Sequence, residues 1–212
     1  MASINQTTEF ATATATDIFE VPLLMATADS LEGYGRIVHS FEEAEVDIVP
    51  WPLSGWRKLI PGTGIEGGLA QDTFEFEWKE SFLYATNHAV RKSYITGMLA
   101  LPGEPMPKDR KAVLVREANY HPDGGQVFFP KNGEPFVALL ALPGDDVRPE
   151  DFRAFYCDGS FGIHINPNVW HQPVYPIADK ATFDDKQGKV HGCVLCDFVE
   201  EFNCWLSVPL SF

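Results

Sequence analysis

Short segments rich in β-branched and aromatic residues recur along the chain, and each is followed by a cluster of glycine, proline, asparagine or aspartate. Such residues suit a pleated, half-buried strand, and the turn-forming clusters end each strand after a few residues. The clusters include PGTGIEGG, LPGEPMPKD, HPDGG, PKNGEP and LPGDDVRPED. Many short strands at even spacing are typical of a β-sandwich or a β-barrel. We therefore expect an all-β fold with minor α content, closed as a barrel.

The clearest strand signal lies in the strand predicted over residues 73–78, where apolar and acidic residues alternate in FEFEW. Asp29 precedes an apolar pattern and can cap a helix, so one short helix is predicted there. A helical turn is predicted over residues 148–155. The other predicted strands cover residues 45–51, 93–101, 112–120, 126–129, 135–142, 162–165, 170–175, 190–199 and 202–208.

The chain length allows one large domain, because 212 residues with 45% hydrophobic content can bury a thick core. No linker or internal repeat divides the sequence. The first residues are rich in threonine, alanine and serine, a composition typical of a loosely docked segment. We predict a flexible N-terminal arm over residues 1–26 and a single barrel domain over residues 27–212.

The net charge of −14, from 30 acidic and 16 basic residues, narrows the choice of partners. Nucleic acids and anionic membrane surfaces both attract lysine and arginine, so neither is an expected partner. No run of about 18 apolar residues is present, and the N-terminus shows no secretory signal. We expect a cytoplasmic protein whose partner is a small molecule.

Four cysteines are present, and Cys193 and Cys196 form a C-x-x-C pair. A zinc ribbon would need a second pair at similar spacing. In a strand, positions three residues apart point to opposite faces, which is poor geometry for chelation. Buried structural thiols in a reducing compartment are therefore favoured over a metal or redox role.

Two segments carry candidate chemistry, NYHPDGGQVFFPKNG (residues 119–133) and GIHINPNVWHQP (residues 162–173). His121, Gln126 and Gly133 match the spacing of the first cupin motif, in which four residues separate His from an acid and six more separate the acid from a Gly. Positions 119 and 121 share one strand face, and the glycine-rich turn returns the next strand beside them. Asn119, His121 and Gln126 can therefore converge, with His171 supplied from an adjoining strand.

A metal at this position is one of two open alternatives. Asn119 and Gln126 stand where the cupin motif has His and Glu, and a neutral amide oxygen is a weaker ligand than a carboxylate. His121, Gln126 and His171 could hold a divalent metal, and a metal-free pocket is equally compatible with the sequence. Each histidine alone could also be a satisfied polar group near the core.

Several segments resemble the ureidoglycolate lyase family, in the same order from about residue 31 to residue 204. They are SLEGYGRIV, HPDGGQVFFP, GEPFVALLALPGDD, FRAF, NVWHQP and the C-terminal Asp197, Asn203 and Cys204. The resemblance implies a cupin-like β-barrel, also called a double-stranded β-helix, that is usually a homodimer. It also implies an enzyme that splits ureidoglycolate into glyoxylate and urea.

The second motif departs from the family pattern NYHRNVWHHP. Asn166, Pro167 and Gln172 replace two histidines and an arginine of that pattern, and His164 is added two residues before Asn166. Tyr120 stands where the family often has an arginine before His-Pro. Two cationic side chains that could hold a small carboxylate are therefore absent.

Ureidoglycolate is a hemiaminal, so its cleavage needs a base for the hydroxyl proton and an acid for the leaving nitrogen. Histidine suits both transfers near neutral pH. We predict His121 and His171 as catalytic residues, with His164 in place of the missing family histidine. Gln126 could orient the ureido group, because a primary amide both donates and accepts hydrogen bonds.

Further residues are candidates for substrate binding. Arg153 could bind a carboxylate, although an ion pair with Glu150 or Asp151 explains it equally well. Glu117 and Asp197 could act as acid, base or partner of a histidine, or could face solvent. The full set of binding candidates is Asn119, Tyr120, Phe128, Arg153, Asn166, Trp170, Glu117 and Asp197.

Two rival functions remain open. The less cationic pocket would suit a larger hydrophobic substrate, with aromatic walls from Trp51, Trp56, Trp78, Phe128 and Trp170. A metal-free cyclase or isomerase of secondary metabolism could polarise a carbonyl there with His and Gln as hydrogen-bond donors. A non-catalytic cupin that binds a small ligand is the third possibility.

Overall fold

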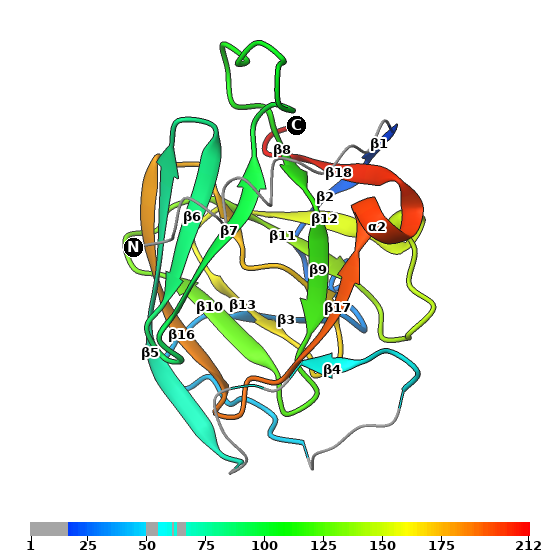
Figure 1. Ribbon diagram of the computed structural model, residues 1–212. Coiled ribbons are helices and arrows are strands. Elements are labelled where there is room, and N and C mark those ends of the chain that lie inside the picture. The colour runs from blue at the N-terminus through cyan, green and yellow to red at the C-terminus, as the bar shows by residue number, and fades with distance from the viewer. Residues whose placement is uncertain (1–16, 50–54, 61, 63–66) are drawn as a thin grey trace.

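The computed structural model describes residues 17–49, 55–60, 62 and 67–212, and they form two large β-sheets that face each other (Figure 1). One sheet has ten strands and the other has eight. The prediction of an all-β fold is confirmed, and the architecture is consistent with a cupin-like barrel. Within these residues, no helix is long and apolar enough to cross a membrane.

The ten-stranded sheet contains the alternating FEFEW segment in its longest strand, β5. Phe74 and Phe76 point into the core, whereas Glu75 and Glu77 point outward. In spatial order the sheet consists of β1 (Asp17–Glu20), β18 (Cys204–Pro209), β8 (Ala112–Val115), β7 (Lys92–Met98), β6 (Phe82–Asn87), β5 (Leu69–Lys79), β16 (Lys180–Gly188), β10 (Gln126–Pro130), β13 (Gly162–Ile165) and β3 (Gly35–Val38).

The eight-stranded sheet is built from shorter strands. In spatial order it consists of β2 (Leu23–Met25), β12 (Arg153–Cys157), β11 (Phe136–Ala141), β14 (Trp170–His171), β9 (Glu117–Tyr120), β17 (Cys193–Asp197) and β4 (Leu59–Ile60), with β15 (Tyr175–Pro176) also paired to β11. The helix α2 (Phe198–Phe202) and the single turn η1 (Pro149–Asp151) are the helical elements of the described residues.

The space between the sheets is filled by aromatic rings. The ring of Phe128 lies 5.4 Å from that of Phe74, and the ring of Phe183 lies 5.1 Å from that of Phe136. Each ring removes a large apolar area from water, and truncating such a phenylalanine to alanine costs about 3–5 kcal/mol. This aromatic core fixes one sheet against the other.

The helix predicted after Asp29 is not formed. Residues 28–34 form turns that lead into β3. Gly33 has a φ of +84°, outside the helical region, and a Cβ at Gly35 would overlap the His164 backbone carbonyl. The two glycines therefore serve a tight turn and a close strand approach.

Two other predicted elements also differ. Residues 45–49 contain no regular strand, and Ile48 forms only an isolated bridge to Gly124, while residues 50 and 51 lie outside the described residues. The predicted helical turn over residues 148–155 is confined to η1, and β12 follows it.

Residues 17–25, within the predicted arm, contribute β1 and β2. These strands pair in parallel with β18 and β12. Residues 1–16 lie outside the described residues. The boundary at residue 26 between an arm and a barrel domain therefore stays a prediction.

Candidate functional site

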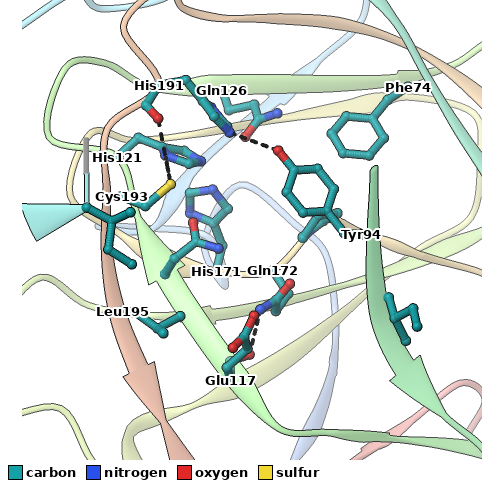
Figure 2. Close-up of a pocket in the computed structure, with 14 residues that line it drawn as sticks. Phe74, Tyr94, Glu117, His121, Gln126, His171, Gln172, His191, Cys193 and Leu195 are labelled. Atoms are coloured by element: carbon teal, nitrogen blue, oxygen red, sulfur yellow. Dashed lines mark hydrogen bonds between the residues drawn. The ribbon is translucent and has the colours of Figure 1, made fainter. Parts of the chain in front are cut away.

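A cavity of about 190 Å³ lies between the two sheets, and polar side chains gather along its wall (Figure 2). Most of the remaining lining is aliphatic or aromatic. The lining residues are Ile60, Phe74, Tyr94, Ile95, Glu117, Asn119, His121, Gln126, His171, Gln172, Pro173, His191, Cys193 and Leu195.

Strand alternation in β9 directs its polar residues into the cavity. Glu117 and Asn119 share the inner face, and His121 continues that face just after the strand. Asn119 pairs with His171 of β14, while Gln126 enters from β10 of the other sheet. The structure therefore brings together five of the predicted site residues, Glu117, Asn119, His121, Gln126 and His171. Their roles stay predictions.

His121 and His171 are neutral and have the same tautomer. Their ring centroids are 5.0 Å apart. The Nδ1 of His121 lies 2.9 Å from the Gly192 carbonyl, and the Nδ1 of His171 lies 2.7 Å from the Val169 carbonyl. A carbonyl only accepts, so each Nδ1 carries the proton and each Nε2 has a lone pair. Burial lowers the pKa of His121 to about 4 and that of His171 to about 3.

Glu117 is the lining residue suited to proton transfer near neutral pH. Burial, with a smaller contribution from the charge of Asp197, raises the pKa of its carboxyl to about 7, against the opposing charge of Arg116. The Nε2 of Gln172 donates to the Glu117 backbone carbonyl over 2.7 Å. A perturbed carboxyl in a cavity is a frequent mark of an acid or base in catalysis.

Gln126 is oriented by a buried polar network. Its Nε2 donates to Asp185 Oδ1 over 2.7 Å and to Gln187 Oε1 over 2.9 Å. Both amide hydrogens are therefore engaged, and Oε1 is the atom left for a ligand. Burial raises the pKa of Asp185 to about 8, so this carboxyl is largely protonated at neutral pH.

His164 and Asn166 lie outside the cavity. In the pairing of β13 with β10, His164 lies opposite Val127, on the face of the sheet that points away from Gln126. Its Nδ1 is 3.2 Å from a guanidinium nitrogen of Arg36. The Asn166 amide donates to the Gly33 carbonyl over 3.3 Å.

Tyr120 and Trp170 also point away from the cavity, because they lie on the outer face of the eight-stranded sheet. Their rings meet edge to face with centroids 4.7 Å apart. The Tyr120 hydroxyl donates to Asp145 Oδ1 over 3.1 Å, and the Trp170 indole donates to the Gly144 carbonyl over 2.8 Å. Both residues therefore hold the loop at residues 144–146.

Three other predicted binding residues do not line the cavity. Arg153 donates to the backbone carbonyls of Glu150 and Phe152. Asp197 caps α2 and lies 2.8 Å from an Arg116 guanidinium nitrogen. Phe128 is fully buried in the aromatic core behind the cavity wall.

The structure adds lining residues that sequence reasoning missed, notably His191, Cys193 and Tyr94. The His191 ring lies 4.1 Å from that of His121, and its Nε2 is 3.2 Å from the Tyr94 hydroxyl. Cys193 lines the cavity, whereas Cys196 is buried on the other face of β17, as the spacing of the C-x-x-C pair predicts. Positions 191 and 193 are two residues apart, and this was the available signal that they could share a face.

Two groups of residues could hold a metal. The cupin-type set of His121, Gln126 and His171 fits a metal poorly, because Gln126 would offer only a neutral amide oxygen. Donor atoms of His121, His191 and Cys193 all lie within 4.8 Å of one another.

Comparisons with known proteins agree on one family. A family model described as ureidoglycolate lyase matches residues 85–202. The ureidoglycolate lyase of Azotobacter vinelandii is 37% identical over 107 residues, which cover 50% of this chain and 61% of that protein. The ureidoglycolate lyase of Salmonella enteritidis is 41% identical over 63 residues, which cover 30% of this chain and 39% of that protein. The chain thus matches less than two thirds of the length of these relatives.

Proposed function

The chain belongs to the ureidoglycolate lyase family, and on this premise we propose that it is a C–N lyase acting on a small hydroxy or ureido acid. The observation that carries the proposal is the cavity in which Glu117, with a pKa of about 7, lines the same wall as His121 and His171. Pockets for drug-sized ligands measure about 300 Å³ or more. The volume of about 190 Å³ therefore supports a small substrate.

We assign the proton transfers to Glu117. In ureidoglycolate cleavage the hydroxyl oxygen loses its proton and becomes the aldehyde oxygen of glyoxylate. The bond from that carbon to nitrogen breaks, and the nitrogen gains a proton to give urea. A carboxyl with a pKa of about 7 can take the first proton as a carboxylate and return it to nitrogen as an acid.

The two histidines suit hydrogen bonding better than proton transfer, because burial keeps both neutral with low pKa values. The Nε2 of His171 is buried without a partner among the described residues. It can accept a hydrogen bond from the terminal amino group of the ureido moiety, and Gln126 Oε1 can accept one from the other ureido N–H. This assignment moves the acid and base role predicted for the histidines to Glu117 and leaves them to orient the substrate.

The second candidate is the cyclase or isomerase. The observation that favours it is the lining, in which the described residues include no arginine or lysine to bind a substrate carboxylate. The small cavity argues against a large hydrophobic substrate. Of its proposed aromatic walls, Trp51 lies outside the described residues, while Trp56 and Trp78 do not line the cavity. A non-catalytic ligand site would show no turnover of either substrate class.

Membership of this family also leads us to propose an oligomeric state, a location and domain bounds for the chain. We propose a homodimer located in the cytoplasm, with residues 27–212 as the barrel domain. Light scattering of the purified full chain tests the dimer, and a monomeric mass would contradict it.

The direct test of the function is release of glyoxylate and urea from ureidoglycolate by the purified protein. We expect turnover by the wild-type chain and a loss of at least about 100-fold in His171→Ala, because the substrate is no longer oriented. Circular dichroism should show an intact fold. Lack of turnover by the wild type, with and without added divalent metal, would refute the lyase proposal.

A further inference from the structure

We propose that His121, His191 and Cys193 form a binding site for one divalent transition metal of the zinc class, at the wall of the cavity that β17 lines. The site deepens the proposed function, because it rests on the same cavity. It differs from the cupin-type set in two of its three ligands and uses residues outside both sequence motifs except for His121.

The donor atoms are already gathered. One ligand atom from each of the three residues lies within 4.8 Å of the others, and Figure 2 shows the three side chains next to one another. Zinc–sulfur and zinc–nitrogen bonds of about 2.3 and 2.0 Å place two tetrahedral ligands about 3.5 Å apart. Small side-chain adjustments would therefore complete a three-residue site.

Unpartnered nitrogen atoms point to a ligand at this place. His191 Nδ1 and His171 Nε2 are both buried and have no hydrogen-bond partner among the described residues. The other nitrogen of each ring is held, in His191 by the Tyr94 hydroxyl and in His171 by the Val169 carbonyl. Metal-binding histidines are commonly oriented in this way, with one nitrogen held by the protein and the other on the metal.

The donor types select the metal class. A thiolate with imidazoles prefers zinc and similar late transition metals over magnesium, calcium or manganese. On binding, the Cys193 thiol would release its proton to solvent as the sulfur–metal bond forms. A bound divalent metal supplies the positive charge that the described lining side chains lack, which an acid substrate requires.

The test uses Co²⁺ as the probe, because a thiolate bound to Co²⁺ gives a charge-transfer absorption band. Full-length protein freed of metal should bind one Co²⁺ per chain with this band. Cys193→Ser should lose the band, and His191→Ala should weaken binding by more than about tenfold, a loss that even outer partners of a metal site can cause.

The matched control is Cys196→Ser, which changes a thiol on the same strand but on the opposite face. It should keep both the band and the affinity. Circular dichroism of each variant checks that the fold is retained. A third variant, Gln126→Ala, separates this site from the cupin-type set and should bind Co²⁺ like the wild type.

Three outcomes would overturn the site: no Co²⁺ binding by the wild type, a band that survives in folded Cys193→Ser, or binding that depends on Gln126 and not on His191. All three are read without substrate. Turnover of ureidoglycolate by protein that fails to bind Co²⁺ would therefore reject the metal site and keep the lyase. Binding as expected without turnover would support the site and reject the lyase.

Discussion

The polar residues on the two faces of strand β9 differ in whether their side chains have hydrogen-bond partners within the protein. On the inner face, Asn119 Oδ1 is buried without a hydrogen-bond partner among the described residues, as is the Nε2 of its pairing partner His171. On the outer face, the Tyr120 hydroxyl is bonded to Asp145. One strand thus presents unsatisfied groups to the cavity and satisfied groups to the surrounding structure.

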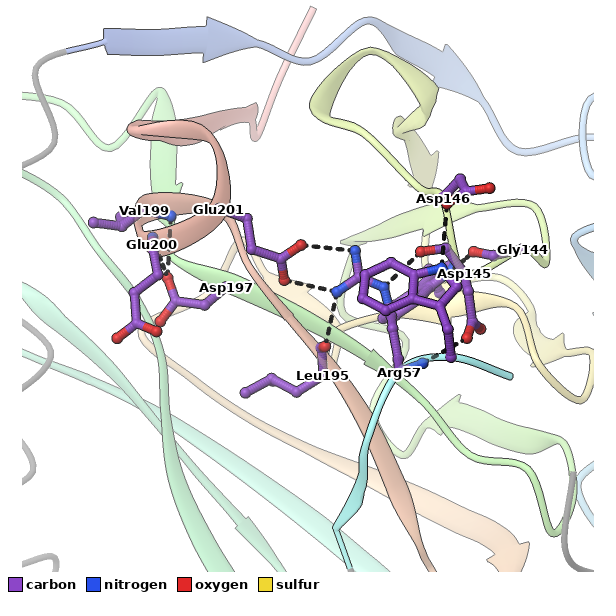
Figure 3. Close-up of polar contacts among 11 residues, drawn as sticks. Arg57, Gly144, Asp145, Asp146, Leu195, Asp197, Val199, Glu200 and Glu201 are labelled. Atoms are coloured by element: carbon purple, nitrogen blue, oxygen red, sulfur yellow. Dashed lines mark hydrogen bonds and ion pairs between the residues drawn. The ribbon is translucent and has the colours of Figure 1, made fainter. Parts of the chain in front are cut away.

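The outer face centres on Arg57, which Figure 3 shows between the loop at residues 144–146 and α2. Its guanidinium makes two bonds to the Glu201 carboxylate, of 2.6 and 2.8 Å, and a third to the Asp145 carbonyl. It also lies over the Trp170 ring, 5.4 Å from the centroid. Paired, planar contacts of this kind hold separate segments in register.

This difference separates the polar residues that stabilise the fold from those that are available to bind a ligand. A buried polar group without a partner costs free energy, so its retention indicates a ligand. A group with every bond made inside the protein has little left to offer a ligand. By this criterion the residues around Arg57 and Tyr120 stabilise the barrel, and the inner face of β9 is the side that we propose for substrate binding.

The largest expected effect comes from Glu117→Gln on the inner face. Removing the group that transfers protons should lower kcat by about 100-fold or more. Steady-state kinetics over pH 5–9 measures the loss, and the wild-type profile should show an ionisation near 7 that the variant lacks.

Tyr120→Phe is the matched control from the outer face of the same strand. It removes the bond to Asp145 and should lower stability by about 1 kcal/mol, with kcat unchanged. Equal losses of kcat in Glu117→Gln and Tyr120→Phe would contradict the proposal that only the inner face of β9 takes part in catalysis.

An intermediate effect is expected from Arg57→Ala on the outer face. Loss of its charged hydrogen bonds should lower the free energy of unfolding by about 2 kcal/mol. Urea denaturation measures this change. The control is Lys131→Ala, whose exposed ion pair with Asp184 should matter less. If Arg57→Ala were as stable as the wild type, the contacts of Arg57 would not contribute to the stability of the fold.

A pH-dependent effect is expected from Asp185→Asn, in the buried polar network that orients Gln126. Burial raises the pKa of Asp185 from 3.8 when unfolded to about 8 when folded. The folded state therefore binds the extra proton between these values, and stability falls as pH rises through them, by at most about 1.4 kcal/mol per pH unit.

Asparagine cannot ionise, so the variant should lack this part of the pH dependence and be more stable than the wild type at pH 8. Thermal unfolding at pH 5 and pH 8 measures the difference. The neighbouring Asp184→Asn should leave the slope in place. A wild-type slope in Asp185→Asn would mean that this carboxyl does not titrate differently on folding.

The sequence predicted much of the fold and several residues that line the cavity, because both depend on local periodicity. The alternation around Phe74 marked β5, and the motif spacing brought His121, Gln126 and His171 together. Period two also separated Cys193 from Cys196 correctly. These are properties of single strands and of the turns that join them.

The missed features depend on contacts between distant segments. Strand β16 reads KATFDDKQG and looks like a polar loop, yet Asp185, Lys186 and Gln187 are buried. Their partners come from elsewhere, including Gln126 and the backbone carbonyl of Ala44. The orientation of His164 likewise depends on how β13 pairs with β10, which no local pattern reveals.

The alternation of β9 has an evolutionary consequence. Substitutions at its inner positions change the groups that face the cavity and leave the hydrogen bonds of the outer face intact. Substitutions at its outer positions remove those bonds and lower the stability of the fold. Substrate specificity can therefore evolve through substitutions on the inner face of the strand while the residues of the outer face keep the fold stable. A relative with the same barrel and a different reaction should differ first at positions 117, 119 and 121.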